Sequence, residues 1–204
     1  MKFILLTLLT LKGSLIMANT AQNFLQISKT GVELDLDVEL LKRPDSQFQK
    51  NLKKVGLTPT RQKKAETYLN ATTSASYAKM LEQTLTSSEM NILCLEANKI
   101  SPIFEKYFKY SQELPEKRLN QDLTDERKRL IKGLLEESRD HEIYPGLPLE
   151  TCISIFASKY ENLSDTEIIS LTKYFKNDVI KKERATWIKF HQNAMAQAAN
   201  VFAP

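Results

Sequence analysis

Histidine and cysteine, which often carry nucleophilic or metal chemistry, are rare in this sequence of 204 residues, which has two of each. His141 lies between Asp140 and Glu142, but neighbouring residues on a helix point in different directions and do not close around one ion. The motifs G-x-S-x-G, H-E-x-x-H and G-x-G-x-x-G are absent from the sequence. We therefore predict no catalytic residue, no metal site and no cofactor. Carboxylate pairs for sugar hydrolysis stay open among the 25 acidic residues.

The first candidate binding feature is a row of three polar or aromatic side chains on one predicted helix. Glu183, Trp187 and His191 follow one another at i, i+4 and i+8, so they share one face of a predicted helix. This row is either a binding stripe or the polar border of a core tryptophan.

A basic stretch forms the second candidate binding feature. Between residues 42 and 64 the only acidic residue is Asp45, and the basic residues are Lys42, Arg43, Lys50, Lys53, Lys54, Arg61, Lys63 and Lys64. We predict no nucleic-acid partner, because only Phe48 and Tyr68 are near enough to stack on bases and the formal net charge is only +4. Lys50, Lys53, Lys54, Arg61, Lys63 and Lys64 are the candidate contacts for anionic lipid, a cell-wall polymer or an acidic protein. The alternative is a solvated face, partly neutralised by Glu33, Asp35, Asp37 and Glu39.

The first residues predict export. Lys2 precedes an apolar run over residues 3–11, and Ala18 is a small residue at a cleavage position, as in a secretory signal peptide. We expect cleavage after Ala18 and a periplasmic or secreted protein. The alternative, suggested by the charge of Lys12, is a buried first helix in a cytoplasmic adaptor. No later segment has 18 consecutive apolar residues, so we expect no membrane span, and peripheral contact with the envelope stays open.

Export also bears on the two cysteines. In an oxidising compartment, Cys94 and Cys152 are expected to form a disulfide, which would stabilise the fold by about 4 kcal/mol. The alternative is two separate buried thiols that act as small apolar side chains.

Residues 19–57 form an N-terminal segment with a strand-like pattern. Apolar and acidic residues alternate from Val32 to Leu40, which predicts a strand, and residues 24–28 would pair with it as a hairpin. The alternative is a short helix that ends before Pro44, because Leu34, Val38 and Leu41 also fit helical spacing.

Residues 58–204 predict a helical domain. Thr58, Thr86, Thr124 and Ser164 are N-cap candidates, and Pro59, Pro102 and Pro148 each mark a predicted helix start. Helices of about 10 to 20 residues joined by short connections predict an all-α, up-down bundle, with the polar stretch 111–125 as a loop or hinge. Gly133 falls inside a predicted helix, where we expect close helix packing or a hinge.

The second capping box carries a family resemblance. Residues 163–168, then Leu171 and the pair Tyr174-Phe175, resemble the C-terminal signature of a family of exported, helical bacterial proteins catalogued as a domain of unknown function. The resemblance extends roughly over residues 61–198. It implies a helical periplasmic or secreted protein of a Gram-negative bacterium, without established catalytic residues.

Together these observations predict an exported, non-catalytic helical protein that binds another macromolecule, most simply a protein, in the bacterial cell envelope. The alternatives are an inhibitor or immunity protein for a secreted enzyme or toxin, and a cell-wall hydrolase.

Overall fold

The computed structural model describes residues 20–113, 123–144 and 146–203, and these residues form helices without any strand. The predicted signal peptide and its cleavage position lie outside the described residues. The helices are α2 (Ala21–Ile27), α3 (Thr30–Lys42), α4 (Gln47–Lys54), α5 (Pro59–Ala71), α6 (Ser74–Thr84), α7 (Ser87–Glu113), α8 (Asp125–Ser138), the short 3-10 helix η1 (Asp140–Ile143), α9 (Leu149–Lys159), α10 (Asp165–Phe175) and α11 (Asp178–Phe202). The all-α prediction is confirmed.

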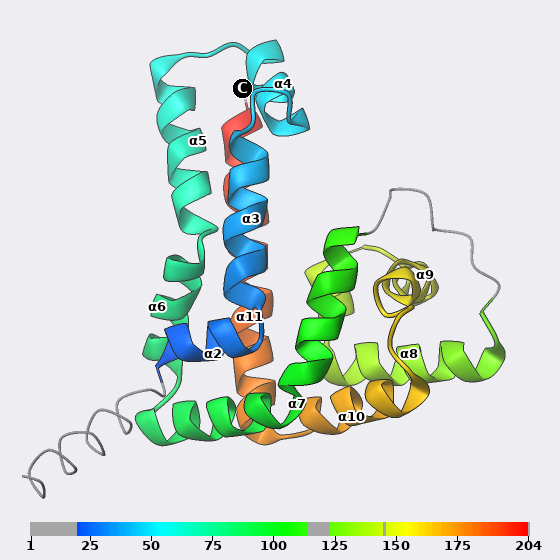
Figure 1. Cartoon of the computed structure of the whole chain (residues 1–204). Coiled ribbons are helices and arrows are strands. Elements are labelled where there is room, and N and C mark those ends of the chain that lie inside the picture. Colours follow the sequence, from blue (N-terminus) through cyan, green and yellow to red (C-terminus); the bar gives the residue numbers. More distant parts are fainter. Residues whose placement is uncertain (1–19, 114–122, 145, 204) are drawn as a thin grey trace, which may run out of the picture.

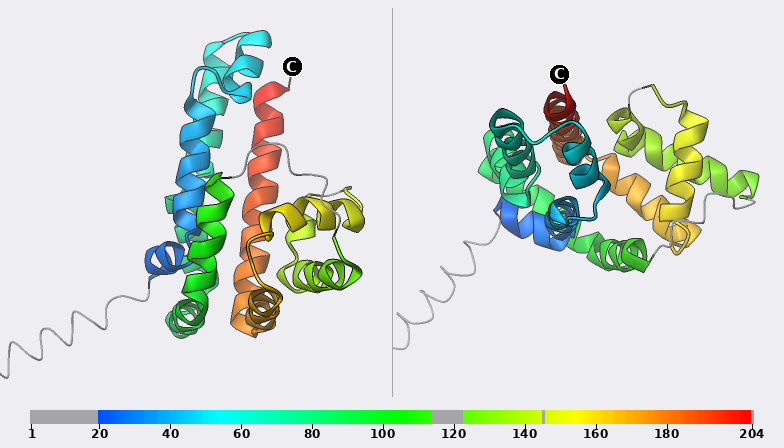
Figure 2. Two further views of the ribbon diagram at one scale, coloured as in Figure 1. Left: turned by 45° about the vertical axis from the view of Figure 1, so that its right-hand side comes forward. Right: turned by 90° about the horizontal axis from the view of Figure 1, so that it is seen from above.

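The helices form a long column with a smaller group beside it. Helix α11 packs on α5 and α6, and α3 packs on α6, so these four helices run alongside one another (Figure 1). Helices α8, α9 and α10 pack together next to the lower part of this column (Figure 2). Within the described ranges, no helix is long and apolar enough to cross a membrane.

Helix α7 joins the two groups. The sequence predicted a new helix at Pro102, whereas α7 continues through this residue and bends along its length (Figure 1). A proline in a helix interior removes one hydrogen bond and kinks the helix without necessarily ending it. Leu93 and Ala97 from the first arm belong to the core under α2, α6 and α11, while Tyr107 from the second arm packs on the core of α8, α9 and α10.

Local caps begin most of the helices where the sequence predicted them. Thr58, Thr124 and Ser164 each accept a hydrogen bond from the backbone N–H three residues later. Ser164 also completes a capping box, because the Glu167 carboxylate accepts from its backbone N–H. These contacts lie within four consecutive residues, which explains why the sequence pattern was sufficient to predict them.

The predicted N-terminal hairpin is wrong, since residues 21–42 form α2 and α3. Leu34 and Val38, spaced by four residues, are the buried side chains of α3, as the helical alternative required. The other aliphatics of the alternating pattern, Val32, Leu36 and Leu40, stay exposed. A helix satisfies its own backbone hydrogen bonds, whereas a two-stranded hairpin is marginal without further strands.

The predicted disulfide is also wrong. Cys94 and Cys152 are free, fully buried thiols that lie in different core clusters. Burial raises the pKa of the Cys94 thiol and keeps it protonated. Both residues therefore act as small apolar side chains, which was the alternative.

Gly133 does not mark close packing. Beyond its chain neighbours and the backbone of its own helix, a Cβ atom at this position would meet no heavy atom within 4 Å. The expectation of tight helix contact at Gly133 is therefore wrong.

Candidate functional site

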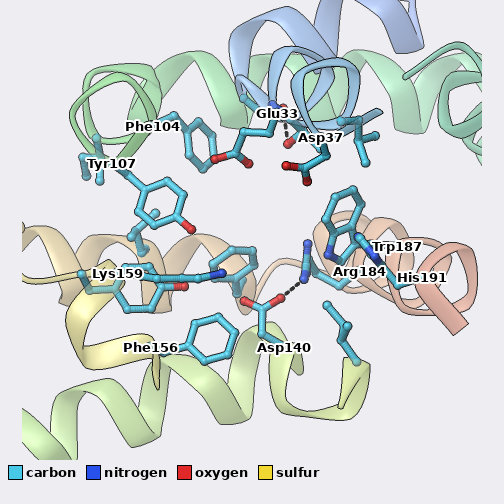
Figure 3. A pocket seen from close by; sticks show the side chains of 18 of the residues that line it. Glu33, Asp37, Phe104, Tyr107, Asp140, Phe156, Lys159, Arg184, Trp187 and His191 are labelled. Carbon is cyan, nitrogen blue, oxygen red and sulfur yellow. Dashed lines mark hydrogen bonds and ion pairs between the residues drawn. The ribbon is translucent and has the colours of Figure 1, made fainter. Parts of the chain in front are cut away.

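A cleft of about 410 Å³ opens where the column meets the α8–α10 group (Figure 3). Its walls come from α3, α7, η1, α9, α10 and α11. The ionisable residues that line it are Glu33, Asp37, Asp140, Lys159, Arg184 and His191, and the aromatic ones are Phe104, Tyr107, Tyr144, Phe156, Tyr160, Phe175 and Trp187. This mixture of aromatic walls and a few polar groups is typical of ligand-binding pockets.

One wall contains a buried ion pair. The guanidinium of Arg184, on α11, binds the Asp140 carboxylate and donates to the Ser138 carbonyl oxygen at 3.1 Å. Its centre lies 5.6 Å from the ring of Phe175 and 5.5 Å from that of Trp187. Burial lowers the pKa of Arg184, but the charges of Asp140 and Glu183 more than offset this effect. Because its charge is matched inside the protein, the pair joins η1 to α11 and leaves little net charge for a ligand.

Two further charges face the cleft without a hydrogen bond or ion pair to the described residues. Asp37 lies on the α3 wall, and Lys159 reaches into the cavity from α9 on the other side (Figure 3). Neither side chain forms a hydrogen bond or ion pair with the described part of the chain. The Lys159 ammonium lies 5.2 Å from the centre of the Phe156 ring. Although Asp37 touches solvent, the surrounding protein removes enough water to raise the pKa of its carboxyl, and the charge of Lys159 opposes this shift.

Neutral polar groups complete the lining. Tyr107 and Tyr160 pack with ring centres 5.5 Å apart, and burial raises the pKa of both phenols, so both hydroxyls remain protonated donors. His191 packs edge-on against Trp187, with ring centres 4.1 Å apart. Burial, aided by the charge of Arg184, lowers the pKa of His191 to about 4. Its buried Nε2 atom therefore belongs to a neutral ring at pH 7, and it has no hydrogen-bond partner in the described chain.

The arrangement supports binding more directly than catalysis. The described residues contain no group of three His, Cys, Asp or Glu side chains that could hold a metal ion. The carboxyl of Asp37, with its raised pKa, faces a wall that carries the Asp140 carboxylate, and this arrangement fits acid-base chemistry. The remaining polar groups are suited to orienting a ligand.

The predicted Glu183 row is only partly at the cleft. Trp187 and His191 line it, whereas Glu183 is buried, with 4% of its surface exposed, and accepts a hydrogen bond from the Tyr77 hydroxyl. Burial raises the pKa of Glu183, although the charge of Arg184 and the Tyr77 hydrogen bond oppose the shift. Glu183 is therefore a core residue.

The predicted basic residues lie away from the cleft, on α4 and α5. Lys50, Lys53, Lys54, Lys63 and Lys64 are exposed, and none of them forms an ion pair within the described ranges. Arg61 has a structural role, because it donates to the carbonyl oxygens of Val55, Gly56, Val201 and Ala203. It ties the start of α5 to the end of α11.

Sequence reasoning missed most of the cleft. Asp37 was noted only as part of the alternating pattern and as a neutralising charge for the basic stretch, and Asp140 only as a neighbour of His141. Lys159 and Tyr107 had no local pattern that set them apart from other helix residues. Comparison with known proteins adds no further assignment, since no family model, curated protein or solved structure matches the chain.

Proposed function

We propose that the protein is a non-catalytic binding protein of the bacterial cell envelope, and that its cleft holds a peptide segment carrying both an ammonium and a carboxylate. The observation that carries this proposal is the pair of charges of opposite sign, Asp37 and Lys159, which face one cavity without a hydrogen bond or ion pair to the described chain. A ligand carboxylate would bind Lys159, and a ligand ammonium would bind Asp37. Charged hydrogen bonds of this kind are stronger than neutral ones.

The aromatic walls suit the rest of such a ligand. Phe104 and Trp187 offer apolar surface for side chains, and a ring face also attracts an ammonium group. The hydroxyls of Tyr107 and Tyr160 and the Nε2 atom of His191 can bind the polar backbone of a peptide. The volume of about 410 Å³ lies within the range of ligand pockets.

The location in the envelope rests on the sequence. The signal-like residues 1–18 and the resemblance of residues 163–175 to exported helical proteins support export. Peptides of the cell wall carry free amino and carboxylate groups, so they are the ligand class that we expect the protein to meet there.

Calorimetric titration tests the proposal. The probe is a synthetic cell-wall stem peptide with free amino and carboxylate groups, compared with the same peptide acetylated and amidated at these groups. We expect binding of the free peptide only, and about tenfold weaker binding by Lys159→Met and by Asp37→Asn, since each removes one charged hydrogen bond.

Matched controls exclude general effects of charge. Lys132→Met and Glu82→Gln each remove one exposed charge that does not line the cleft, and we expect both to bind as the unchanged protein does. Equal binding of the free and blocked peptides, or unchanged binding by both cleft variants, would refute the proposal.

A cell-wall hydrolase is the second candidate, favoured by the raised pKa of Asp37 in a cleft that also contains Asp140. Incubation with purified cell wall distinguishes it from a binding protein. A hydrolase releases soluble fragments, and Asp37→Asn abolishes this release while cell-wall binding persists. The absence of fragments with the unchanged protein excludes this candidate.

A further inference from the structure

One end of the column combines exposed lysines with the end of the last helix. Figures 1 and 2 show that α4, the connection from α4 to α5, and the C-terminal end of α11 meet there. Phe48 and Leu52 form the buried face of α4 and pack with Val201 of α11. The opposite face of α4 carries Lys50, Lys53 and Lys54, and the first two turns of α5 add Lys63 and Lys64.

The acidic residues of α3 have surroundings other than these five lysines. Asp35 accepts hydrogen bonds from the backbone and the hydroxyl of Ser74, and Glu39 pairs with Lys42. Glu33 and Asp37 line the cleft. Glu39 therefore neutralises one residue of the basic stretch, Lys42, as the sequence alternative proposed. Lys50, Lys53, Lys54, Lys63 and Lys64 are exposed and form no ion pair within the described ranges.

An apolar turn projects from the same end. Val55 and Leu57 lie between α4 and α5 and are 40% and 50% exposed. Gly56 between them has a φ of +87°, a conformation that side chains disfavour. Arg61 holds the turn by donating to the Val55 carbonyl at 2.6 Å and the Gly56 carbonyl at 3.0 Å. The turn thus presents two aliphatic side chains on a braced backbone beside the lysines.

We propose that this end docks peripherally on a lipid bilayer that contains anionic lipids. The lysines would bind the headgroups, and Val55 and Leu57 would enter the boundary between headgroups and acyl chains. A soluble anionic polymer would match the lysines but would gain nothing from the exposed aliphatic turn. This combination of charge and apolar surface is the reason for choosing a bilayer as the partner.

Co-sedimentation with vesicles tests this inference. The full chain is mixed with vesicles of phosphatidylcholine alone and of phosphatidylcholine with phosphatidylglycerol, at low and at high salt. We expect binding to increase with phosphatidylglycerol and to weaken at high salt, because salt screens exposed charges. All variants keep the same residues 1–18, so any binding by this segment, including that of Lys2 and Lys12, is common to all of them and cancels when variants are compared.

Charge reversal identifies the surface. Lys53→Glu, Lys54→Glu and Lys63→Glu together should weaken binding to the anionic vesicles about 100-fold or more, because each lysine near the surface contributes about fivefold. The control reverses Lys128, Lys132 and Lys181, which changes the net charge equally, and it should retain most of the binding.

Changes in the turn identify the partner. Val55→Ser with Leu57→Ser should weaken vesicle binding about tenfold while the fold stays intact, because both side chains are exposed.

Equal binding to both vesicle types, or an equal loss in the charge control, would overturn the proposal. The proposal would also be overturned if the turn variant bound vesicles as strongly as the unchanged protein and soluble polyphosphate displaced the vesicles. That result would assign the lysines to a soluble polyanion. The cleft variants Lys159→Met and Asp37→Asn should bind vesicles normally, so this test is independent of the proposed function.

Discussion

Replacing Tyr77 with phenylalanine tests how the core accommodates the carboxyl group of Glu183. Tyr77 has no exposed surface, and its hydroxyl is the hydrogen-bond donor to Glu183, which is itself 4% exposed. Tyr77→Phe keeps the ring but leaves a buried acceptor without this donor. Hydrogen bonds to charged groups contribute about 1.5 to 3 kcal/mol, so we expect the free energy of unfolding to fall by about 2 kcal/mol. For a chain of this size, this loss lowers the Tm by about 4 to 8 °C.

A second substitution separates the hydrogen bond from the packing. In Tyr77→Phe with Glu183→Met, the acceptor is removed together with its donor, and a side chain of similar volume fills the space. Because the cost arises from an unsatisfied buried group, we expect the double variant to be more stable than Tyr77→Phe alone. Arg184 retains Asp140 as its partner in both variants.

Urea denaturation followed by tryptophan fluorescence measures these effects. Trp187 is the only tryptophan, and its ring centre lies 5.0 Å from that of Tyr77, so it reports on this part of the core. Tyr144→Phe is the control, because it removes a hydroxyl from a residue that is 37% exposed. If Tyr77→Phe and Tyr144→Phe lose the same free energy, or if the double variant is the least stable, the reasoning is refuted.

Three further predictions concern titration, backbone and thiols. The pKa of His191 is lowered from 6.5 to about 4, so its contribution to the free energy of unfolding is fully present above pH 6.5 and is lost, by about 3 kcal/mol, as the pH falls to 4. In unfolding titrations, His191→Gln should therefore lose less stability over this pH range than the unchanged protein. Equal losses in the two proteins would contradict the shift. Gly133→Ala should raise the free energy of unfolding by about 1 kcal/mol, since a Cβ atom there meets nothing within 4 Å beyond its chain neighbours and the backbone of its own helix; a destabilised variant would show that the helix needs a glycine. Cys94 and Cys152 should react with a thiol reagent only after unfolding, and a reducing agent should leave the unfolding midpoint unchanged; a midpoint lowered by reduction would indicate a disulfide.

The helices that the sequence predicted best are those whose signals are local. A cap such as Ser164 with Glu167 operates over one turn, so the same few residues specify and stabilise it in any tertiary context. Pro102 was harder to interpret, because a proline is compatible both with a helix start and with a bend inside a helix. Packing of the two arms of α7 on different cores decided between them.

The error at residues 32–40 has a different cause. The alternating pattern of this segment satisfies the period of a strand, while Leu34 and Val38 also satisfy that of a helix. The choice depended on which neighbours were available for burial. Helices α2, α6 and α4 pack on α3, and no strand exists among the described residues to continue a sheet.

The sequence alone determined the all-α class, most helix starts and the presence of a basic stretch, because these properties depend on residues close together in the chain. The tertiary structure decided which charges are matched. It paired Arg184 with Asp140, directed Asp35 to Ser74, and left Asp37 and Lys159 facing one cavity. The cleft combines residues from positions 28 to 191, and a contact between such distant positions is set by how the helices pack and not by any local pattern.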